Sequence, residues 1–410
     1  MTNPLRNNKE KTARLIASLP KTDIHLHFDG SIRLNTIIEL AKKDGVELPA
    51  YTEEGLGTLV FKDSYNNLEE YLRTFGYSCA VLQRPENLER VAYEIAEDNW
   101  KEGVRYIEVR FAPQLLMNKY QDYLTIMNAV NKGLRKAQAL FNADPDVKSG
   151  AVPPFKYGII VCAMRFFGPW SEHYQDIYRS FAHSSVRDIV SLGSEAVADA
   201  TVKLKQTSDM PVVAFDIAGA ENGYPANWHA SAFRKTREAF IHSTVHAGEA
   251  YDAESIHQAV FDLHAERIGH GFHLFLPDRL QNPDIADKLA YTERLREYIA
   301  KRRITLEVCL TSNLQTAPFL KTMASHPFGK MLKHRVSAVL CTDNRTVSKT
   351  TVTKETHLAV EAFDMSPAQL KDTVMEGFRA AFFHGTQAEK EAYVRQCETF
   401  YDKTAASHGF

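Results

Sequence analysis

Short apolar runs alternate along the chain with longer segments in which apolar residues recur at helical spacing. Runs such as YIEVRF, YGIIVCAM and PVVAFDI are apolar at most positions. Strands buried on both faces of a parallel sheet have this pattern, because helices cover both sides of the sheet. The pattern predicts eight strands, at Thr22–Phe28, Val104–Ala112, Phe155–Arg165, Pro211–Gly219, Thr244–Glu249, Arg267–His273, Thr305–Thr311 and Val336–Thr342.

Amphipathic segments lie between these strands. The clearest predicted helices are Tyr123–Phe141, Ser184–Lys205, Ala232–Ile241, Ala253–Leu263 and Ile285–Lys301. Eight strands that alternate with helices predict an α/β protein with a (β/α)8 barrel of the TIM type. An open, doubly wound parallel sheet is the alternative that fits the same alternation.

Two segments add helices to this scheme. Residues 50–102 contain two predicted helices between the first and second strands, and we interpret them as a helical insertion over the barrel mouth. Residues 351–410 have helical patterns to the end and are expected to pack on the outside of the barrel. Barrels of this type often reach this length as one domain, so we expect residues 1–410 to form a single barrel domain.

Composition narrows the class of protein. The chain has 410 residues, of which 44% are hydrophobic and 24% charged, as in ordinary globular enzymes. The 49 basic and 51 acidic residues are interspersed, which argues against a nucleic-acid partner or a membrane surface. The first residues lack the apolar core of a signal peptide, and no apolar run is long enough to cross a membrane. The five cysteines are scattered without a CxxC pair, so we expect free thiols and a cytoplasmic location.

Polar residues with chemical potential gather where the predicted strands end. The strand ends carry His25, His27 and Asp29, then His246 and Glu249, then His270, and finally Asp343 and Asn344. In a parallel barrel these ends meet on one face, which is where active sites form. We therefore expect these side chains to lie in one site.

Each of these motifs is weak alone. Two histidines at positions i and i+2 of a strand share a face and suit a metal, yet a single histidine is more often a core residue. Asp343 can equally be a helix cap or a turn residue. Together, histidines and a carboxylate at several strand ends are the usual ligands of a catalytic zinc ion. A core of this size needs no structural metal, so a bound ion is expected to be catalytic.

The same segments carry a family resemblance. LPKTDIHLHFDGSI, GVRYIEVRFAP, VVAFDIAGAE, VHAGEA, RIGHGFHL and the TDN segment resemble motifs of adenosine deaminases, in family order from Leu19 to about Glu355. The combination of HxHxDG, HAGE and GHG is highly specific. The family fold is a (β/α)8 barrel, which agrees with the strand count.

The resemblance implies a role for each matching residue. One Zn2+ per chain is bound by His25, His27, His246 and Asp343. Glu249 protonates the purine at N1, and His270 orients the attacking water and helps to deprotonate it. Asp29 holds the ribose 5′-hydroxyl, and the Gly219 amide meets N3. The implied reaction is hydrolytic deamination of a purine nucleoside at C6, which converts adenosine or 2′-deoxyadenosine to the inosine product and ammonia. Protonation at N1 near neutral pH requires a carboxyl group whose pKa is raised, which burial can achieve.

Asn344 departs from the commonest family pattern, which has two adjacent aspartates there. In the family the second aspartate contacts the purine N7, and an asparagine amide can donate to N7 without being protonated. Asp29 favours a free 5′-hydroxyl, whereas adenine deaminases that resemble this family tend to have Glu there, and N6-methyl-AMP deaminases tend to have Asn.

Four other functions remain open alternatives. A 5′-modified adenosine or free adenine can be the substrate of the same site. The chain can also be a binding protein without activity on this scaffold, or a two-metal amidohydrolase with a carboxylated lysine, although no lysine stands at a central strand end. A polynucleotide-editing zinc deaminase is disfavoured, because the PCxxC motif is absent from the sequence.

Overall fold

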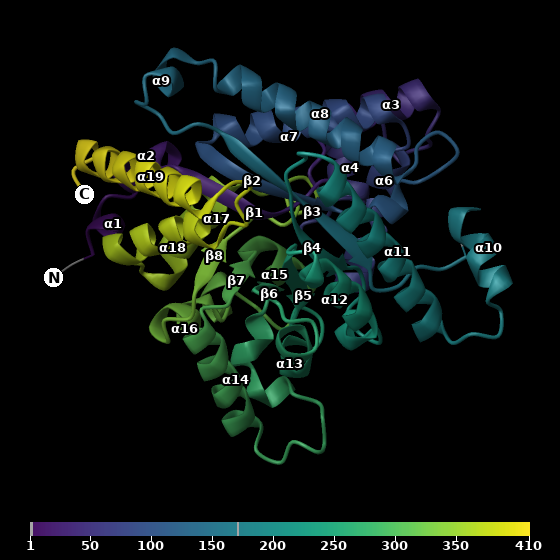
Figure 1. The fold of residues 1–410 in the computed structure, drawn as a ribbon. Coiled ribbons are helices and arrows are strands. Elements are labelled where there is room, and N and C mark those ends of the chain that lie inside the picture. The colour runs from purple at the N-terminus through teal and green to yellow at the C-terminus, as the bar shows by residue number, and fades with distance from the viewer. Residues whose placement is uncertain (1–2, 170–171) are drawn as a thin grey trace.

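The computed structural model describes residues 3–169 and 172–410. Its eight strands are hydrogen-bonded in sequence order, β1 to β8, and neighbours are parallel (Figure 1). This order and the nearly closed sheet confirm the (β/α)8 barrel and exclude the doubly wound sheet, in which strand order departs from chain order. The strands are β1 Lys21–His27, β2 Val104–Phe111, β3 Lys156–Met164, β4 Val212–Ala218, β5 His242–Ala247, β6 Arg267–His270, β7 Thr305–Val308 and β8 Ala338–Leu340.

The barrel closes between β1 and the residues that follow β8. Leu26 and Asp343 form a parallel bridge. The His27 amide donates to the Asp343 carbonyl at 2.7 Å, and the Asp343 amide donates to the His25 carbonyl at 2.8 Å. The seam of the barrel therefore places two predicted site histidines beside the predicted site aspartate.

Helices surround the strands. Before β3 they are α1 Pro4–Asn7, α2 Lys9–Ser18, α3 Leu34–Asp44, α4 Glu53–Leu59, α5 Leu68–Arg73, α6 Phe75–Ala80, α7 Pro85–Lys101, α8 Tyr123–Phe141 and α9 Pro145–Lys148. After β3 they are α10 Glu172–Ser180, α11 Val186–Thr207, α12 Ala230–Glu238, α13 Ala253–Phe261, α14 Lys288–Arg302, α15 Leu310–Thr316, α16 Phe328–Lys333, α17 Val352–Phe363, α18 Pro367–Ala380 and α19 Gln387–Ser407. Short 3-10 turns are η1 Pro113–Leu115, η2 Ala226–His229, η3 Phe272–Phe275, η4 Pro277–Arg279 and η5 Met323–Ser325.

The last three strands are shorter than their apolar runs predict. β6 ends at His270, because Gly271 has a φ of 66° and η3 follows at once. β7 ends at Val308, two residues before α15 begins. Apolar runs mark burial, and buried turns at the barrel mouth share that character with buried strands.

The prediction of two helices in residues 50–102 is wrong, because four helices, α4 to α7, lie there. Pro85 occupies the first position of α7, where proline is favoured, and starts a new helix. Helix α7 packs against β2 and α8 as a barrel helix, whereas α5 and α6 border the pocket at the mouth.

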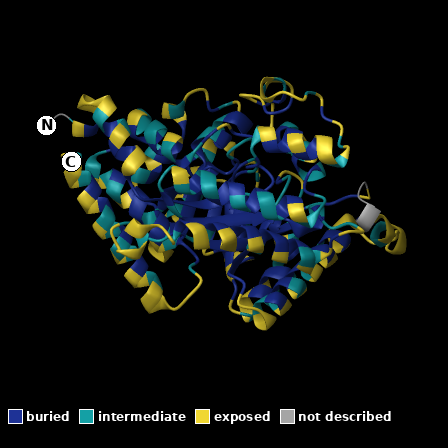
Figure 2. Cartoon of the chain, turned by 90° about the horizontal axis from the view of Figure 1, so that it is seen from above, coloured by how far each residue is buried: buried dark blue, intermediate teal, exposed yellow. Residues whose placement is uncertain are grey.

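The core fills the barrel and the layer between strands and helices (Figure 2). Strand β3 is buried at every position from Tyr157 to Ala163. Helices α17 to α19 pack on the barrel beside the N-terminal helices, so the two chain ends lie on the same side (Figure 1). No helix in the described part of the chain combines the length and apolarity that a membrane span requires.

Candidate active site and metal centre

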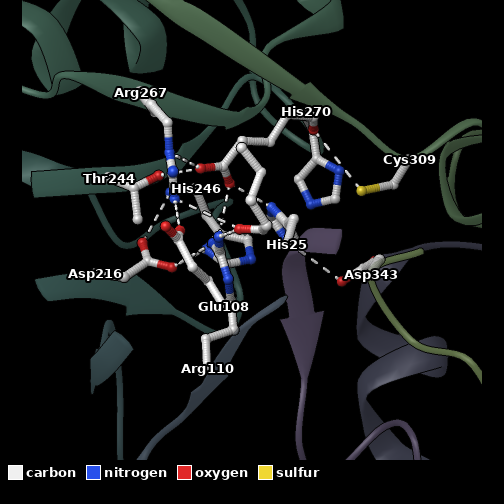
Figure 3. A network of polar contacts seen from close by, with 12 residues as sticks. His25, Glu108, Arg110, Asp216, Thr244, His246, Arg267, His270, Cys309 and Asp343 are labelled. Carbon is white, nitrogen blue, oxygen red and sulfur yellow. Dashed lines mark hydrogen bonds and ion pairs between the residues drawn. The ribbon is translucent and has the colours of Figure 1, made fainter. Parts of the chain in front are cut away.

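The structure brings the predicted site residues together at the carboxyl ends of the strands. The ring centroids of His25 and His246 are 4.6 Å apart, and those of His25 and His270 are 4.9 Å apart (Figure 3). A cavity of about 510 Å³ opens beside them, within the size range of small-ligand pockets. Its lining includes the predicted residues His27, Asp29, Gly219, His246, Glu249, His270, Asp343 and Asn344.

Three imidazole nitrogens and one carboxylate oxygen form a compact donor set. The Nε2 atoms of His27 and His246 are 3.0 Å apart. Asp343 Oδ1 lies 3.3 Å from His27 Nε2 and 3.4 Å from His25 Nε2. Around a tetrahedral ion with bonds of about 2.0–2.2 Å, ligand atoms are separated by roughly 3.3–3.6 Å. These spacings fit one metal ion.

His25 Nε2 supplies an independent test of the fit. This atom is buried and makes no hydrogen bond with any residue that the structure describes. A buried polar atom without a partner is costly, and a metal ion satisfies it. An overlapping set also meets the spacing of a metal site, with His270 in place of His27 and all donor atoms within 4.8 Å of one another.

Carboxylates behind two of the histidines orient their rings. His25 Nδ1 lies 2.6 Å from Glu307 Oε2, and His246 Nδ1 lies 2.9 Å from Asp216 Oδ2. Arg110 contacts both carboxylates, at 2.8 and 2.9 Å (Figure 3). Burial alone would raise the pKa of Glu307, but Arg110 and Arg267 hold it well below its usual value. A carboxylate that binds the Nδ1 proton leaves the Nε2 lone pair free for a metal.

Sequence analysis missed this layer of charged residues. Glu307, Asp216 and Arg110 stand inside the apolar runs of β7, β4 and β2. A charged residue within a run that is otherwise mostly apolar was the available signal, because such a residue must be paired when buried.

Glu249 is buried at the pocket, and its environment favours the neutral acid. Burial, and then the negative charges of Asp343 and Glu221, raise the pKa of its carboxyl well above the usual value. Its Oε2 lies 3.5 Å from His270 Nε2, and its Oε1 accepts from the Thr316 hydroxyl at 3.3 Å. A protonated carboxyl can donate to a ring nitrogen of a ligand.

The turn that carries Glu249 is held by Glu221, a second residue that sequence analysis missed. The Glu221 carboxylate accepts from the backbone amides of Gly248, Glu249 and Ala250 at 2.7, 3.0 and 2.7 Å. It also accepts from Tyr251 N at 3.0 Å. These bonds fix the backbone on both sides of Glu249.

Asp29 differs from the carboxylates behind the histidines. Burial raises the pKa of Asp29 to about 6. Its Oδ2 accepts a weak bond from Cys79 Sγ at 3.7 Å, and its Oδ1 is buried without a hydrogen-bond partner among the described residues. Oδ1 is therefore an acceptor available to a ligand.

The amide of Asn344 is wedged between Gly30 and Tyr71. A Cβ atom on Gly30 would lie 1.7 Å from Asn344 Oδ1, so only glycine fits there. Asn344 Nδ2 donates to the Tyr71 hydroxyl at 2.7 Å, and that hydroxyl also contacts Ser348 Oγ at 2.8 Å. Tyr71 comes from α5, and no motif in the sequence indicated this contact.

Gly269 and His270 show why the GHG segment folds as it does. A Cβ atom on Gly269 would lie 2.8 Å from His25 Cε1, so a larger residue would displace a donor ring. His270 has a φ of 64°, a left-handed conformation that is costly for a residue with a Cβ.

Comparison with known proteins places this chain in a family. The family model described as adenosine deaminase matches residues 20–196 and 184–394. An adenosine deaminase of Mycobacterium marinum is 34% identical over 373 residues, 90% of this chain and 92% of the relative. One of Clostridium botulinum is 34% identical over 365 residues, 89% of this chain and 94% of the relative. A probable adenosine deaminase of Dictyostelium discoideum is 31% identical, and its match covers 92% of this chain but 42% of the relative's own length.

Solved structures share the fold. An adenine deaminase from Arthrobacter aurescens has a TM-score of 0.73 and 20% identity, and the match covers 94% of this chain and all of that one. An amidohydrolase from Burkholderia ambifaria with bound Zn has a TM-score of 0.72 and 22% identity, with 97% and 94% covered. The N6-methyl-AMP deaminase of Arabidopsis thaliana has a TM-score of 0.69 and 22% identity, with 96% and 99% covered.

Fold and site together define a (β/α)8 barrel with a buried cluster of histidines and an aspartate at its mouth that can bind a metal. Within that class, the family match extends over most of the sequence. The chain belongs to the adenosine deaminase family.

Proposed function

We propose that the protein hydrolyses the 6-amino group of a purine nucleoside, and that it converts adenosine or 2′-deoxyadenosine to the inosine product and ammonia. One observation carries this proposal. A buried carboxyl, Glu249, has a raised pKa and shares a pocket with three histidines and an aspartate spaced for one metal ion. Deamination of a purine requires such a pair, because a nucleophile must add at C6 while a proton is delivered to the ring.

We assign the donor set to one zinc ion held by His25, His27, His246 and Asp343. The donor spacings support the assignment, and so does the buried Nε2 of His25, which makes no hydrogen bond with a described residue. When bound, zinc supplies a hydroxide nucleophile at neutral pH by lowering the pKa of water to about 7. The chain's own part is to orient the rings, through Glu307 and Asp216.

Glu249 is the proton donor to purine N1 in this proposal. Its carboxyl keeps the proton near neutral pH because burial and neighbouring negative charge disfavour ionisation. Glu221 holds the turn so that the carboxyl stays in place. The Gly219 amide, at the end of β4 in the pocket lining, is the proposed contact of N3.

Asp29 and Asn344 complete the proposed contacts. The unpartnered Asp29 Oδ1 accepts from the ribose 5′-hydroxyl. Asn344, also in the pocket lining, is the proposed contact of purine N7. Its Nδ2 donates to the Tyr71 hydroxyl in this structure, so a bond to N7 requires that donor to turn toward the pocket.

Other substrates of the same site are the competing proposal. Structures with this fold include an adenine deaminase and an N6-methyl-AMP deaminase. The buried carboxyl of Asp29 favours a hydroxyl over a phosphate at the 5′ position, because an ionised carboxylate repels a phosphate. We further propose a cytoplasmic role in purine metabolism, which the balanced charge and five free thiols support.

A screen for ammonia release tests the proposal. The compounds are adenine, adenosine, 2′-deoxyadenosine, 5′-methylthioadenosine and AMP, assayed with zinc-loaded protein whose metal content is measured. We expect the highest kcat/KM for adenosine or 2′-deoxyadenosine, and one zinc per chain. A higher kcat/KM for AMP or adenine would reject the nucleoside assignment, and two metals per chain would favour a different amidohydrolase reaction.

A further inference from the structure

A line of hydrogen bonds runs from a backbone amide to the pocket histidine His270. The Phe328 amide donates to His326 Nδ1 at 3.0 Å. His326 Nε2 lies 3.1 Å from Asn313 Oδ1, and Asn313 Nδ2 lies 2.9 Å from His270 Nδ1. All three side chains are buried.

The first bond determines the direction of all the others. A backbone N–H can only donate, so His326 Nδ1 carries no proton and its Nε2 does. That Nε2–H must donate, which makes the facing atom of Asn313 the amide oxygen. The amide nitrogen then donates to His270 Nδ1, so Nδ1 carries no proton. The remaining ring proton of His270 is on Nε2, which is the nitrogen 3.5 Å from Glu249 Oε2.

We propose that Asn313 and His326 are positioning residues that hold His270 in its Nε2–H form, so that the ring presents a hydrogen-bond donor to the reacting centre. The tautomer follows from the geometry alone, whereas its value in catalysis rests on the proposed function. An Nε2 that carries a proton can donate to the reacting oxygen but cannot accept a proton from it. His270 then orients the nucleophile, and the proton-accepting part of the role implied by the resemblance is withdrawn.

The same tautomer resolves the choice between two donor sets. A ligating imidazole nitrogen needs a free lone pair, and His270 Nε2 has none in this form. His270 is therefore excluded from the metal set, although its ring lies within 4.8 Å of the other donors. His27 is left as the third histidine, in keeping with its 3.0 Å approach to His246.

Asn313→Asp is the sharpest test, since it replaces the amide donor with an acceptor of the same shape. The carboxylate still accepts from His326 but cannot donate to His270, so the His270 proton should move to Nδ1. The 15N spectrum of histidine-labelled protein reads this directly, because protonated and unprotonated ring nitrogens resonate in separate ranges. The His270 signals are assigned by their loss in His270→Ala, and spectra are recorded on zinc-loaded and metal-depleted protein without substrate.

We expect wild-type His270 to show an unprotonated Nδ1 and a protonated Nε2, and Asn313→Asp to reverse them. With zinc content unchanged, kcat should fall roughly 10–100-fold with little change in KM, the scale for partners that orient a catalytic ring. Asn7→Asp, the same change at an exposed residue of α1, should leave both readouts unchanged. A protonated Nδ1 in the wild type, or normal kcat in the reversed tautomer, would overturn the proposal.

Two variants of His326 separate positioning from packing. His326→Gln keeps one donor and one acceptor, whereas His326→Phe keeps the ring shape and loses both. We expect the Gln variant to retain the wild-type His270 spectrum and most of kcat, and the Phe variant to lose both. Equal kcat in the two variants would reject the relay. If wild-type protein released no ammonia from any adenine compound, the proposed function would fail, and the spectrum would still decide the tautomer.

Discussion

The buried carboxylates inside the barrel and those lining the pocket differ in their partners. In the interior, Arg267 contacts Glu108 and Arg110 contacts Asp216 (Figure 3). Both arginines also contact Glu307. Both arginines are fully buried, and each carboxylate has a cation against it. The pKa values of Asp216 and Glu307 are held below their usual range despite burial.

In the pocket, neither Asp29 nor Glu249 forms an ion pair with an arginine or lysine of the described residues, and the charge of Arg165 only partly offsets the rise in the pKa of Glu249. Each is buried, each has a raised pKa, and burial is the largest cause in both. The interior carboxylates are fixed as anions that orient the rings of His25 and His246, whereas the pocket carboxylates keep unused hydrogen-bonding capacity. Asp23 and Glu355 are also buried with raised pKa values, but threonine hydroxyls occupy their oxygens and neither lines the pocket. The groups available to a substrate are therefore those that combine a missing counter-ion with a place in the pocket lining.

Glu249→Gln tests the pocket carboxyls and has the largest expected effect. The amide keeps the shape of the side chain but has no transferable proton, so kcat should fall about 10²–10⁴-fold, the usual scale of general acid catalysis. Zinc content and the thermal midpoint should not fall, because a neutral amide replaces a neutral acid. Steady-state kinetics and metal analysis test this, with Glu391→Gln on the exposed face of α19 as control. Near-normal kcat would show that Glu249 only shapes its turn.

Arg110→Met tests the ion pairs of the interior carboxylates. Removal of Arg110 from this buried ionic network leaves Asp216 without an arginine and Glu307 with Arg267 alone, at a cost of about 3–5 kcal/mol in the free energy of unfolding. Urea unfolding followed by circular dichroism measures the loss. Zinc affinity should also fall, because the carboxylates behind two ligand rings lose the arginine that holds them in place.

The matched control for that change is Arg395→Met. Arg395 is exposed, and its ion pair with Glu391 is long, at 3.8 Å, and open to solvent. Its replacement should therefore change stability by no more than about 0.5 kcal/mol. If Arg110→Met were as mild as the control, the interior network would not need its cation.

The apolar pattern of the strands made the pocket carboxylates predictable from the sequence. Parallel strands buried on both faces are continuous apolar runs, so their number and order could be predicted from the sequence. The pocket residues were found because they follow these runs, at the end of the barrel where strands meet. Asp29 and Glu249 are examples, and the structure places both in the lining of one pocket.

The partners of the interior carboxylates depend on contacts between residues far apart in sequence, which no local pattern predicts. Glu307 pairs with Arg110 across 197 residues of sequence, and Asn313 reaches His270 across 43. The contact of Tyr71 with Asn344 spans 273 residues and begins in a helix that the sequence analysis did not separate from its neighbours. Partners across the barrel are determined by strand register, which apolar periodicity leaves open.

Asp29→Ala tests which group of the substrate the unpartnered Oδ1 binds, and its expected effect is smaller. If Oδ1 accepts from the 5′-hydroxyl, the variant should lose about 1.5–3 kcal/mol in transition-state binding of adenosine, as for other bonds to charged groups. The loss for 5′-deoxyadenosine should be much smaller, because that compound lacks the hydroxyl. Values of kcat/KM for both substrates and both proteins complete the cycle. Equal losses would show that Asp29 does not recognise the hydroxyl.

The smallest expected effect is the pH dependence of stability, which should differ between the two sets of carboxylates. The pKa of Asp29 is about 6 in the folded protein against about 3.9 in an unfolded chain, so its contribution to stability is present below pH 4 and lost as the pH rises through 6. The full shift corresponds to about 3 kcal/mol. Because Asp29 lines the pocket, we expect screening by solvent to reduce the measured difference to on the order of 1 kcal/mol. Asp29→Asn cannot titrate, so in metal-depleted protein its free energy of unfolding should rise relative to that of the wild type between pH 4 and 7.

Asp216 has a lowered pKa, so its contribution to stability is complete above pH 4 and lost at lower pH. The free energy of unfolding of Asp216→Asn should therefore fall relative to that of the wild type as the pH rises toward 4. From pH 4 to 7 the difference should change little. Urea unfolding across the pH range measures both differences, and the same window or the same sign for the two variants would show that the paired and unpaired carboxylates do not differ as their partners indicate.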